Sequence, residues 1–259
     1  MSGTERKKPA VIFIHGIGGS ARVWEPQMAS FAAAGYTPVA LDLPGYGGRT
    51  PVAALHFEGL AADVETEIER RGLARPVLVG HSMGGMIVQA ILRRRPDSYS
   101  AAVLACTSPA FGNADGEFQR KFVGDRLGPL DAGQTMADLA PTMVARMAGP
   151  AADPAGCAHA IEVMSAVPAD TYRAAVRCLV AFDERANLPR IAVPVLCLAG
   201  EKDPNAPAPV VERMAGKLPG ARYACLSGIG HLPNVEAPAA FDAAILDFLR
   251  QALAPAAPE

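Results

Sequence analysis

Six short apolar runs, most of them without polar alternation, constrain the fold of this 259-residue chain more than any other feature. They have strand length and lie at residues 10–15, 37–43, 76–80, 101–106, 193–200 and 221–228. Strands that are apolar on both sides belong in a parallel sheet covered on both faces. Segments with helical periodicity separate the runs, at about 22–34, 52–71, 83–95, 207–218 and 238–252. The pattern predicts an α/β fold with a mostly parallel sheet covered by helices on both faces.

The alternation of strands and helices stops between residues 109 and 189. This stretch contains no β-rich run, and four helical segments punctuated by "GP", "AGP", "DP" and "VP" fill it. We interpret residues 109–189 as an inserted helical cap, and residues 1–108 together with 190–259 as the α/β core.

The segment "RPVLVGHSMGGMIVQAIL" places Ser82 where an apolar strand gives way to a helical period. Gly80 and Gly84 lack a Cβ atom, so strand and helix can approach closely while the serine adopts a strained backbone conformation. Such a strand-turn-helix exposes the hydroxyl, which makes Ser82 a candidate nucleophile.

A serine nucleophile requires a base, and the chain has five histidines. His231 follows the last apolar run in "LSGIGHLPNVEAP", in a Gly-rich loop expected at the carboxyl edge of the sheet. It is the candidate base. His15 and His81 are interpreted as residues that hold loops together by hydrogen bonds, and His56 and His159 as surface or packing residues.

The base in turn requires an orienting carboxylate. In "LCLAGEKDPNAP", Glu201 and Asp203 directly follow a buried run, and we choose Asp203 as the acid. An Asp-Pro turn initiator is the alternative reading of Asp203. Asp183 and Glu184, where the cap rejoins the core, are the alternative acids. The chain order serine, aspartate, histidine matches the nucleophile, acid, base order associated with a serine on such a strand-turn-helix.

Backbone N–H groups can stabilise the oxyanion of a tetrahedral intermediate. The amide of Met83 comes with the turn, and a second amide is expected from "HGIGGS", with Ile17 as the first choice and Gly18 as the alternative. The same loop lacks the lysine and the glycine spacing of phosphate-binding loops, which argues against nucleotide binding. We therefore expect neither a cofactor nor a metal.

Composition excludes several partner classes. The formal net charge is −2 with acids and bases interspersed, which disfavours nucleic acid and anionic membranes as partners. The first ten residues lack an apolar leader segment, and five cysteines without a C-x-x-C pair suit reduced thiols. These features predict a cytoplasmic protein acting on a small molecule. Its oligomeric state stays open, a homo-oligomer included.

The motifs "HGIGG", "LDLPGYGGR", "GHSMGG", "LAGEKDP" and "GIGHLPNVEAPAAF" span nearly the whole chain, which resembles the α/β-hydrolase-fold serine hydrolases. It is similar to the capped group that contains 3-oxoadipate enol-lactonases, small carboxylesterases and carbon-carbon hydrolases of aromatic degradation. The resemblance implies Ser82 as nucleophile, Asp203 as acid and His231 as base. The segment before residue 10 is too short for the N-terminal antiparallel hairpin usual in this family, so that edge of the sheet is expected to be reduced.

We therefore expect a serine hydrolase that cleaves a small carboxylic ester or lactone through an acyl-enzyme. Carbon-carbon bond hydrolysis is the alternative, although Leu232 stands where such hydrolases often have a different neighbour of the histidine. A non-catalytic ligand-binding protein on the same scaffold is a third reading, and its usual signature is a missing triad member. We expect the small-molecule substrate to be apolar or aromatic. Apolar cap residues that either line a substrate pocket or form the core of the cap are Phe111, Phe118, Phe122, Met136, Met143, Met147 and Met164.

Overall fold

A computed structural model describes residues 8–111 and 116–254 of the chain, so both ends of the predicted core and residues 112–115 of the predicted cap lie outside the described residues. One six-stranded sheet organises the molecule, in the order β2-β1-β3-β4-β5-β6, and every pair of neighbours is parallel. The strands are β1 (Ala10–Ile14), β2 (Thr37–Leu41), β3 (Val77–His81), β4 (Ala101–Ala105), β5 (Val195–Gly200) and β6 (Arg222–Leu226). The predicted α/β fold is confirmed, and β2 is an edge strand among the described residues.

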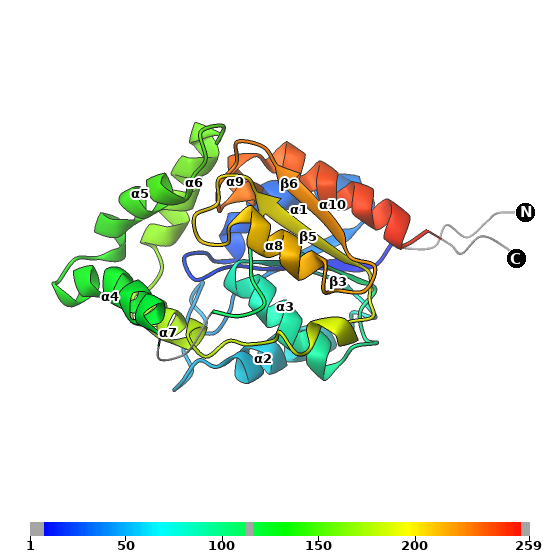
Figure 1. Ribbon diagram of the computed structural model, residues 1–259, viewed down its shortest axis with the longest axis horizontal. Helices are drawn as coiled ribbons and strands as arrows, with labels where there is room; N and C mark the ends of the chain where they lie inside the picture. The colour runs from blue at the N-terminus through cyan, green and yellow to red at the C-terminus, as the bar shows by residue number, and fades with distance from the viewer. Residues whose placement is uncertain (1–7, 112–115, 255–259) are drawn as a thin grey trace, which may run out of the picture.

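Helices cover both faces of this sheet (Figure 1). Helices α1 (Glu25–Ala33) and α10 (Pro238–Ala252) pack against each other on one side. Helices α2 (Phe57–Arg70) and α3 (Met83–Arg94) pack together on the other, and α8 (Ala208–Ala215) packs against β5 and β6. Short helices η1 (Ala21–Trp24), η2 (Leu188–Arg190) and α9 (Pro233–Glu236) complete the core.

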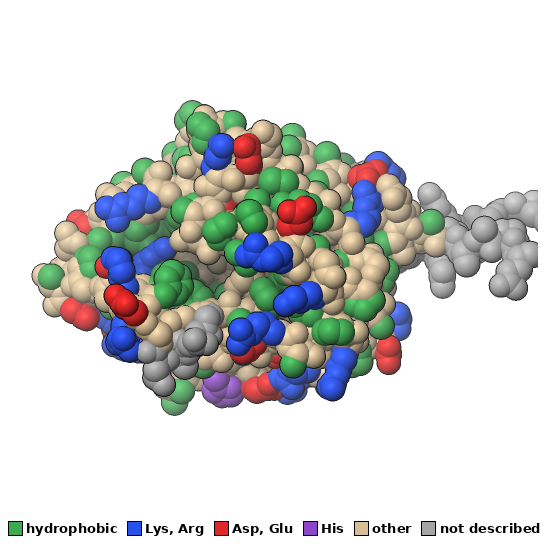
Figure 2. Space-filling view, viewed as in Figure 1, with side chains coloured by type: hydrophobic (Ala, Val, Ile, Leu, Met, Phe, Trp, Pro, Cys, Tyr) green, Lys and Arg blue, Asp and Glu red, His purple; other side chains and the backbone are tan. Residues whose placement is uncertain are grey.

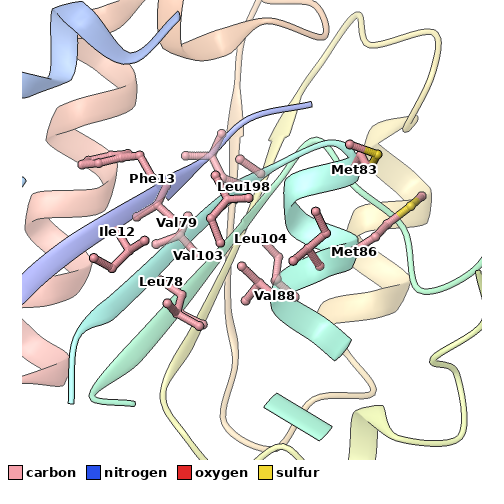
Figure 3. Close-up of a cluster of buried hydrophobic side chains, with 14 of the residues drawn as sticks. Ile12, Phe13, Leu78, Val79, Met83, Met86, Val88, Val103, Leu104 and Leu198 are labelled. Atoms are coloured by element: carbon pink, nitrogen blue, oxygen red, sulfur yellow. The ribbon is translucent and has the colours of Figure 1, made fainter. Parts of the chain in front are cut away.

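The centre of the sheet is apolar on both faces because β1, β3, β4 and β5 are buried along their whole length. Val79, Val103 and Leu104 from the central strands lie between Phe13 of β1 and the helical residue Val88 (Figure 3). Burial of this surface supplies the main favourable free energy of folding, at roughly 25 cal/mol per Å² of apolar area. It also explains why these strands lack alternation.

Within the part of the chain that the structure describes, four α-helices lie between β4 and β5 and form one group beside the core (Figure 1). They are α4 (Glu117–Asp131), α5 (Met136–Met147), α6 (Pro154–Ser165) and α7 (Ala169–Leu179). The expected helical insertion is therefore present, while its limits at residues 109 and 189 as a separate unit stay a prediction. An isolated antiparallel bridge between Ala110 and Asp183 joins the two ends of the insertion.

The turn after α5 fits closely against the loop that carries His231. A Cβ atom on Gly149 would lie 2.2 Å from the carbonyl oxygen of Gly228, and one on Gly230 would lie 2.0 Å from that of Met147. Glycine is thus required for this close approach of insertion and core. None of the helices in the described part of the chain is long and apolar enough to cross a membrane.

Candidate active site

Ser82 occupies a strained turn between β3 and α3. Its φ is 54° and its ψ −118°, in a region that residues with a side chain rarely adopt. The two neighbouring glycines make this turn possible: a Cβ on Gly80 would lie 2.3 Å from the carbonyl oxygen of Gly84, and one on Gly84 would lie 2.1 Å from that of Ile14. Ser82 therefore belongs neither to β3, which ends at His81, nor to α3, which begins at Met83, and its side chain is half-buried.

Three side chains from distant parts of the chain form one hydrogen-bonded series. The Nε2 atom of His231 lies 3.1 Å from Ser82 Oγ, and its Nδ1 lies 2.8 Å from Asp203 Oδ2. Asp203 and His231 are buried, with 0% and 7% of their side chains exposed. The structure thus brings together all three residues that the sequence selected for a triad, at distances suited to proton transfer from the serine.

The Asp203 carboxylate is held in its ionised form. Burial acts to raise its pKa, but the neighbouring His231 and the hydrogen bonds that it receives outweigh burial and lower the pKa below the usual range. Its Oδ1 accepts hydrogen bonds from the backbone N–H groups of Asn205 and Ala206, at 2.8 and 3.0 Å. Asp203 therefore also acts as the turn residue of the alternative reading: Oδ1 binds the backbone of the turn, while Oδ2 contacts His231.

The alternative acids lie away from His231. Asp183 is exposed, and its carboxylate accepts hydrogen bonds from Arg185. Glu184 is buried and accepts a hydrogen bond from Arg93 at 2.9 Å. Within the described residues, neither carboxylate contacts the histidine.

Glu236 holds the histidine loop in place, and the sequence analysis missed it. This carboxylate is 1% exposed and accepts three backbone hydrogen bonds. They come from Gly230 and Gly149 to Oε2, at 2.7 and 2.8 Å, and from Leu232 to Oε1, at 2.7 Å. Two of the donors flank the histidine and the third belongs to the insertion. Its sequence signal is weak, since an acid on a short helix before proline is an ordinary surface pattern.

His15 and His81 stabilise loops of the site. His15 accepts a hydrogen bond from the N–H of Leu43 at Nε2, which leaves Nδ1–H to donate to the carbonyl of Gly16, 2.8 Å away. His81 Nε2 lies 2.6 Å from the carbonyl oxygen of His231 and donates to it. Burial lowers the pKa of His15 to about 4 and that of His81 to about 3, so both rings are neutral at pH 7.

The two amides expected to bind an oxyanion lie at the start of α3 and in the loop after β1. Met83 is the first residue of α3, where backbone N–H groups have no partner within the helix. The carbonyl of Gly16 accepts hydrogen bonds from His15 Nδ1 and from the N–H of Gly19, at 2.8 and 3.1 Å. Because a trans peptide directs its N–H opposite its carbonyl, these bonds orient the N–H of Ile17. Ile17 and the alternative Gly18 both line the cavity beside Ser82.

A cavity of about 180 Å³ opens over Ser82 and His231. Figure 2 shows a hollow in the surface beside the α4–α7 group, with hydrophobic side chains in it and Lys or Arg side chains next to them. The proposed cap residues that line this cavity are Phe111, Phe118, Phe122, Met143, Met147 and Met164. Met136 is buried without being part of that lining. The Met164 side chain lies so close over the loop that a Cβ on Gly18 would be 2.6 Å from its terminal methyl.

One group of side chains has the chemistry of a metal site. Cys106, Asp203 and His231 each bring a ligand atom to within 4.8 Å of the others. The Asp203 and His231 atoms are already hydrogen-bonded to each other, and burial followed by the Asp203 charge raises the pKa of the Cys106 thiol well above its usual value. A protonated thiol is a poor metal ligand. The expectation of a site without metal or cofactor stays a prediction.

Comparison with known proteins establishes the family. Residues 11–244 match the model of the "Alpha/beta hydrolase family". The chain belongs to this family. This match confirms the α/β-hydrolase fold and the resemblance to α/β hydrolases that the sequence predicted.

The relatives of this α/β hydrolase carry names of several hydrolytic activities. It is 31% identical to "Putative carbamate hydrolase RutD" of Variovorax paradoxus, over 96% of this chain and 94% of the relative. It is 26% identical to "3-oxoadipate enol-lactonase 2" of Acinetobacter baylyi, over 92% of this chain and 87% of that protein. Among solved structures, the enol-lactonase from Burkholderia xenovorans has a TM-score of 0.81 at 25% identity, covering 95% of this chain and 93% of the other.

Proposed function

We propose that this α/β hydrolase is a serine hydrolase that cleaves a small carboxylic ester or lactone through an acyl-enzyme. The observation that carries the proposal is the series from Ser82 Oγ through His231 to Asp203, with contacts of 3.1 and 2.8 Å, beside an apolar cavity. The names of the relatives add support for hydrolysis of a carbonyl compound, since a lactone and a carbamate both contain an acyl carbon.

In the acylation step, Ser82 Oγ attacks the carbonyl carbon of the substrate while His231 Nε2 takes the hydroxyl proton. The carbonyl π electrons move to the oxygen, and the N–H groups of Ile17 and Met83 stabilise the resulting oxyanion. When the carbonyl re-forms, the bond to the leaving oxygen breaks, and His231 donates the proton to that oxygen. In a lactone the leaving hydroxyl remains attached to the acyl group.

In the deacylation step, a water molecule replaces the leaving group and the same transfers run again. His231 takes a proton from the water, whose oxygen attacks the acyl carbon. When the carbonyl re-forms, the bond between Ser82 Oγ and the acyl carbon breaks, His231 donates the proton to Oγ, and the carboxylic acid is released. Asp203 keeps the Nδ1–H of the imidazole in place and stabilises the imidazolium that forms in each half-reaction. The proposed chemistry uses side chains and backbone amides alone.

The test is the Ser82→Ala variant, assayed with p-nitrophenyl acetate and a panel of esters and lactones of graded size. We expect kcat to fall by about three orders of magnitude or more, because the oxyanion site and substrate binding retain part of the rate enhancement. Ser98→Ala, an exposed serine before β4, is the matched control and should keep wild-type turnover. Near-wild-type hydrolysis by Ser82→Ala would refute the proposal.

Covalent labelling identifies the nucleophile independently of any substrate choice. A fluorophosphonate should add once per chain in the wild type, at the peptide that contains Ser82, and should leave Ser82→Ala unlabelled in mass spectra. Adding a vinylogous diketone to the panel tests carbon-carbon hydrolysis with the same residues. A far higher kcat/KM for the diketone than for every ester and lactone would replace the proposed ester specificity.

A further inference from the structure

Arg126 of α4 is the one lysine or arginine that lines the cavity over Ser82 within residues 8–111 and 116–254. No aspartate or glutamate from these residues lines the same cavity. Apart from histidine, the remainder of the lining is apolar side chains with a few neutral polar groups. A full positive charge therefore faces a mostly apolar space, where its interaction with an anion is stronger than in bulk water.

The contacts of Arg126 are with neutral groups. Its Nη1 donates to the hydroxyl of Tyr172 at 3.4 Å and its Nη2 to the side-chain carbonyl of Asn205 at 3.2 Å. The guanidinium carbon lies 4.9 Å from the ring centroid of Phe122. A guanidinium has five N–H donors, so these contacts orient the group while leaving donors for a ligand. Arg126 forms no ion pair with any carboxylate of the described chain.

Two acidic residues that border a neighbouring cavity together with Arg126 are engaged elsewhere. They are Asp125 and Asp138. Asp125 accepts a hydrogen bond from Lys121 at 2.7 Å, and Asp138 accepts from the backbone N–H of Thr135 at 2.8 Å. Arg49, by contrast, pairs with Asp63 through two contacts of 2.8 Å, which is how an arginine with a structural role is commonly satisfied.

We propose that Arg126 binds a carboxylate of the substrate, which makes the substrate an acidic ester or lactone. The carboxylate and the reacting carbonyl would be separated by an apolar segment, since aromatic and methionine side chains of the insertion lie along the same cavity as Ser82. A planar guanidinium with free donors matches a carboxylate by paired, charge-assisted hydrogen bonds. The inference rests on the proposed function and specifies the substrate class for the same site.

Asn205 connects the proposed anion site with the triad. Its side-chain carbonyl accepts the hydrogen bond from Arg126, and its backbone N–H donates to Asp203 Oδ1 at 2.8 Å. The loop that follows β5 thus contacts both the arginine and the acid. A substrate held by Arg126 would therefore lie against a segment whose position is already fixed relative to His231.

Two pairs of esters test the proposal, each pair matched in size. For a carboxylate on the acyl arm, mono-(4-nitrophenyl) adipate is compared with the 4-nitrophenyl ester of adipamic acid. For a carboxylate on the alcohol arm, 4-acetoxybenzoate is compared with 4-acetoxybenzamide. In at least one pair we expect the wild type to prefer the carboxylate over the carboxamide by about tenfold to a hundredfold in kcat/KM, as for a charge-assisted hydrogen bond.

The variants identify the cation responsible. Arg126→Gln should bring the preference close to one, whereas Arg126→Lys, which keeps the charge but not the paired donors, should keep part of it. Arg213→Gln removes the same charge from an exposed position on α8 and should keep the wild-type preference. Circular dichroism should show that all three variants are folded. If Arg126→Gln does not fold, Arg126→Lys replaces it as the test variant. The proposal then predicts a smaller preference for the carboxylate ester in Arg126→Lys than in Arg213→Gln.

Two results would overturn the inference: equal kcat/KM within both pairs in the wild type, or a preference that persists in Arg126→Gln. Failure of the proposed function has a different signature. In that case the hydrolysis of the neutral carboxamide esters would be absent, or would survive in Ser82→Ala. Hydrolysis of the neutral esters that requires Ser82 but shows no preference for a carboxylate would refute the anion site alone.

Discussion

Replacing Glu236 with glutamine should lower both the stability and the turnover of this hydrolase. The carboxylate accepts hydrogen bonds from the N–H groups of Gly230, Gly149 and Leu232, at 2.7 to 2.8 Å, and is 1% exposed. A glutamine amide has a single acceptor oxygen and turns an NH₂ group toward at least one of these donors. At least one bond is therefore lost, and a buried N–H is left without a partner.

The magnitude follows from those bonds. A buried donor left unsatisfied costs about 1–3 kcal/mol, and loss of the negative charge weakens the two remaining bonds by roughly 0.5–1 kcal/mol each. The sum is about 2–5 kcal/mol in the free energy of unfolding. For a chain of this size, about 2–4 °C of melting temperature corresponds to each kcal/mol, so the expected shift is roughly −4 to −20 °C.

The catalytic effect should be larger than a surface substitution can produce, because two of the lost or weakened bonds flank His231. A misplacement of about 1 Å between reacting groups can cost about 100-fold in rate. We therefore expect kcat on a simple ester to fall by at least tenfold at a temperature where the variant is fully folded. Differential scanning calorimetry and steady-state kinetics measure the two effects.

Glu201→Gln is the matched control. Glu201 is exposed and accepts hydrogen bonds from Ser227 and from the N–H of Gly228 in the same loop, at 2.9 and 2.7 Å. The hydrogen bond from Gly228, followed by those from Lys202 and Ser227, lowers the pKa of Glu201 to about 2. Because water can replace an exposed acceptor, this variant should lose less stability and keep its kcat. A Glu236→Gln protein with the melting temperature and kcat of the wild type would refute the reasoning.

Three further outcomes are expected. Asp203→Asn should remain folded by circular dichroism and lose on the order of 10⁴-fold in kcat, since an amide can hold the imidazole in the wrong tautomer, whereas Asp183→Asn should lose far less; the reverse ranking would reassign the acid. Gly84→Ala should prevent expression of folded, active protein, because its Cβ would lie 2.1 Å from a carbonyl oxygen of β1; a soluble variant with wild-type activity would contradict this. Burial lowers the pKa of His15 to about 4 and of His81 to about 3, so below pH 6.5 the unfolded chain binds protons that the folded chain does not. The free energy of unfolding should then fall between pH 7 and 4, on the order of 3 kcal/mol for each histidine, and urea melts showing the same stability at both pH values would refute it.

The sequence by itself determined the alternation of elements and the position of the candidate nucleophile. The helix predicted at 238–252 is α10 with those bounds, and the apolar run at 76–80 is nearly β3. Both follow from local patterns, because periodicity and buried strands depend on near neighbours in the chain. "GHSMGG" likewise predicts the strained turn at Ser82, since its glycines are needed within a few residues of the serine.

The sequence also predicted that certain residues far apart in the chain lie close together, where the fold brings strand ends to one edge. Asp203 and His231 each follow a strand, β5 or β6, and parallel strands place their carboxyl ends together. That rule selected Asp203 and His231, whose Oδ2 and Nδ1 atoms lie 2.8 Å apart. Asp183 and Glu184 follow a helix and lie elsewhere.

Only the tertiary structure decided which side chains complete the site. Glu236 holds the histidine loop because the insertion returns to the core at Gly149, a contact between segments 87 positions apart that no local pattern records. Arg126 and Met164 line the cavity and Met136 does not, although each lies on a helix of the insertion. Periodicity says which side of a helix is apolar, but the packing of one helix against another determines whether that side meets the core or the substrate cavity.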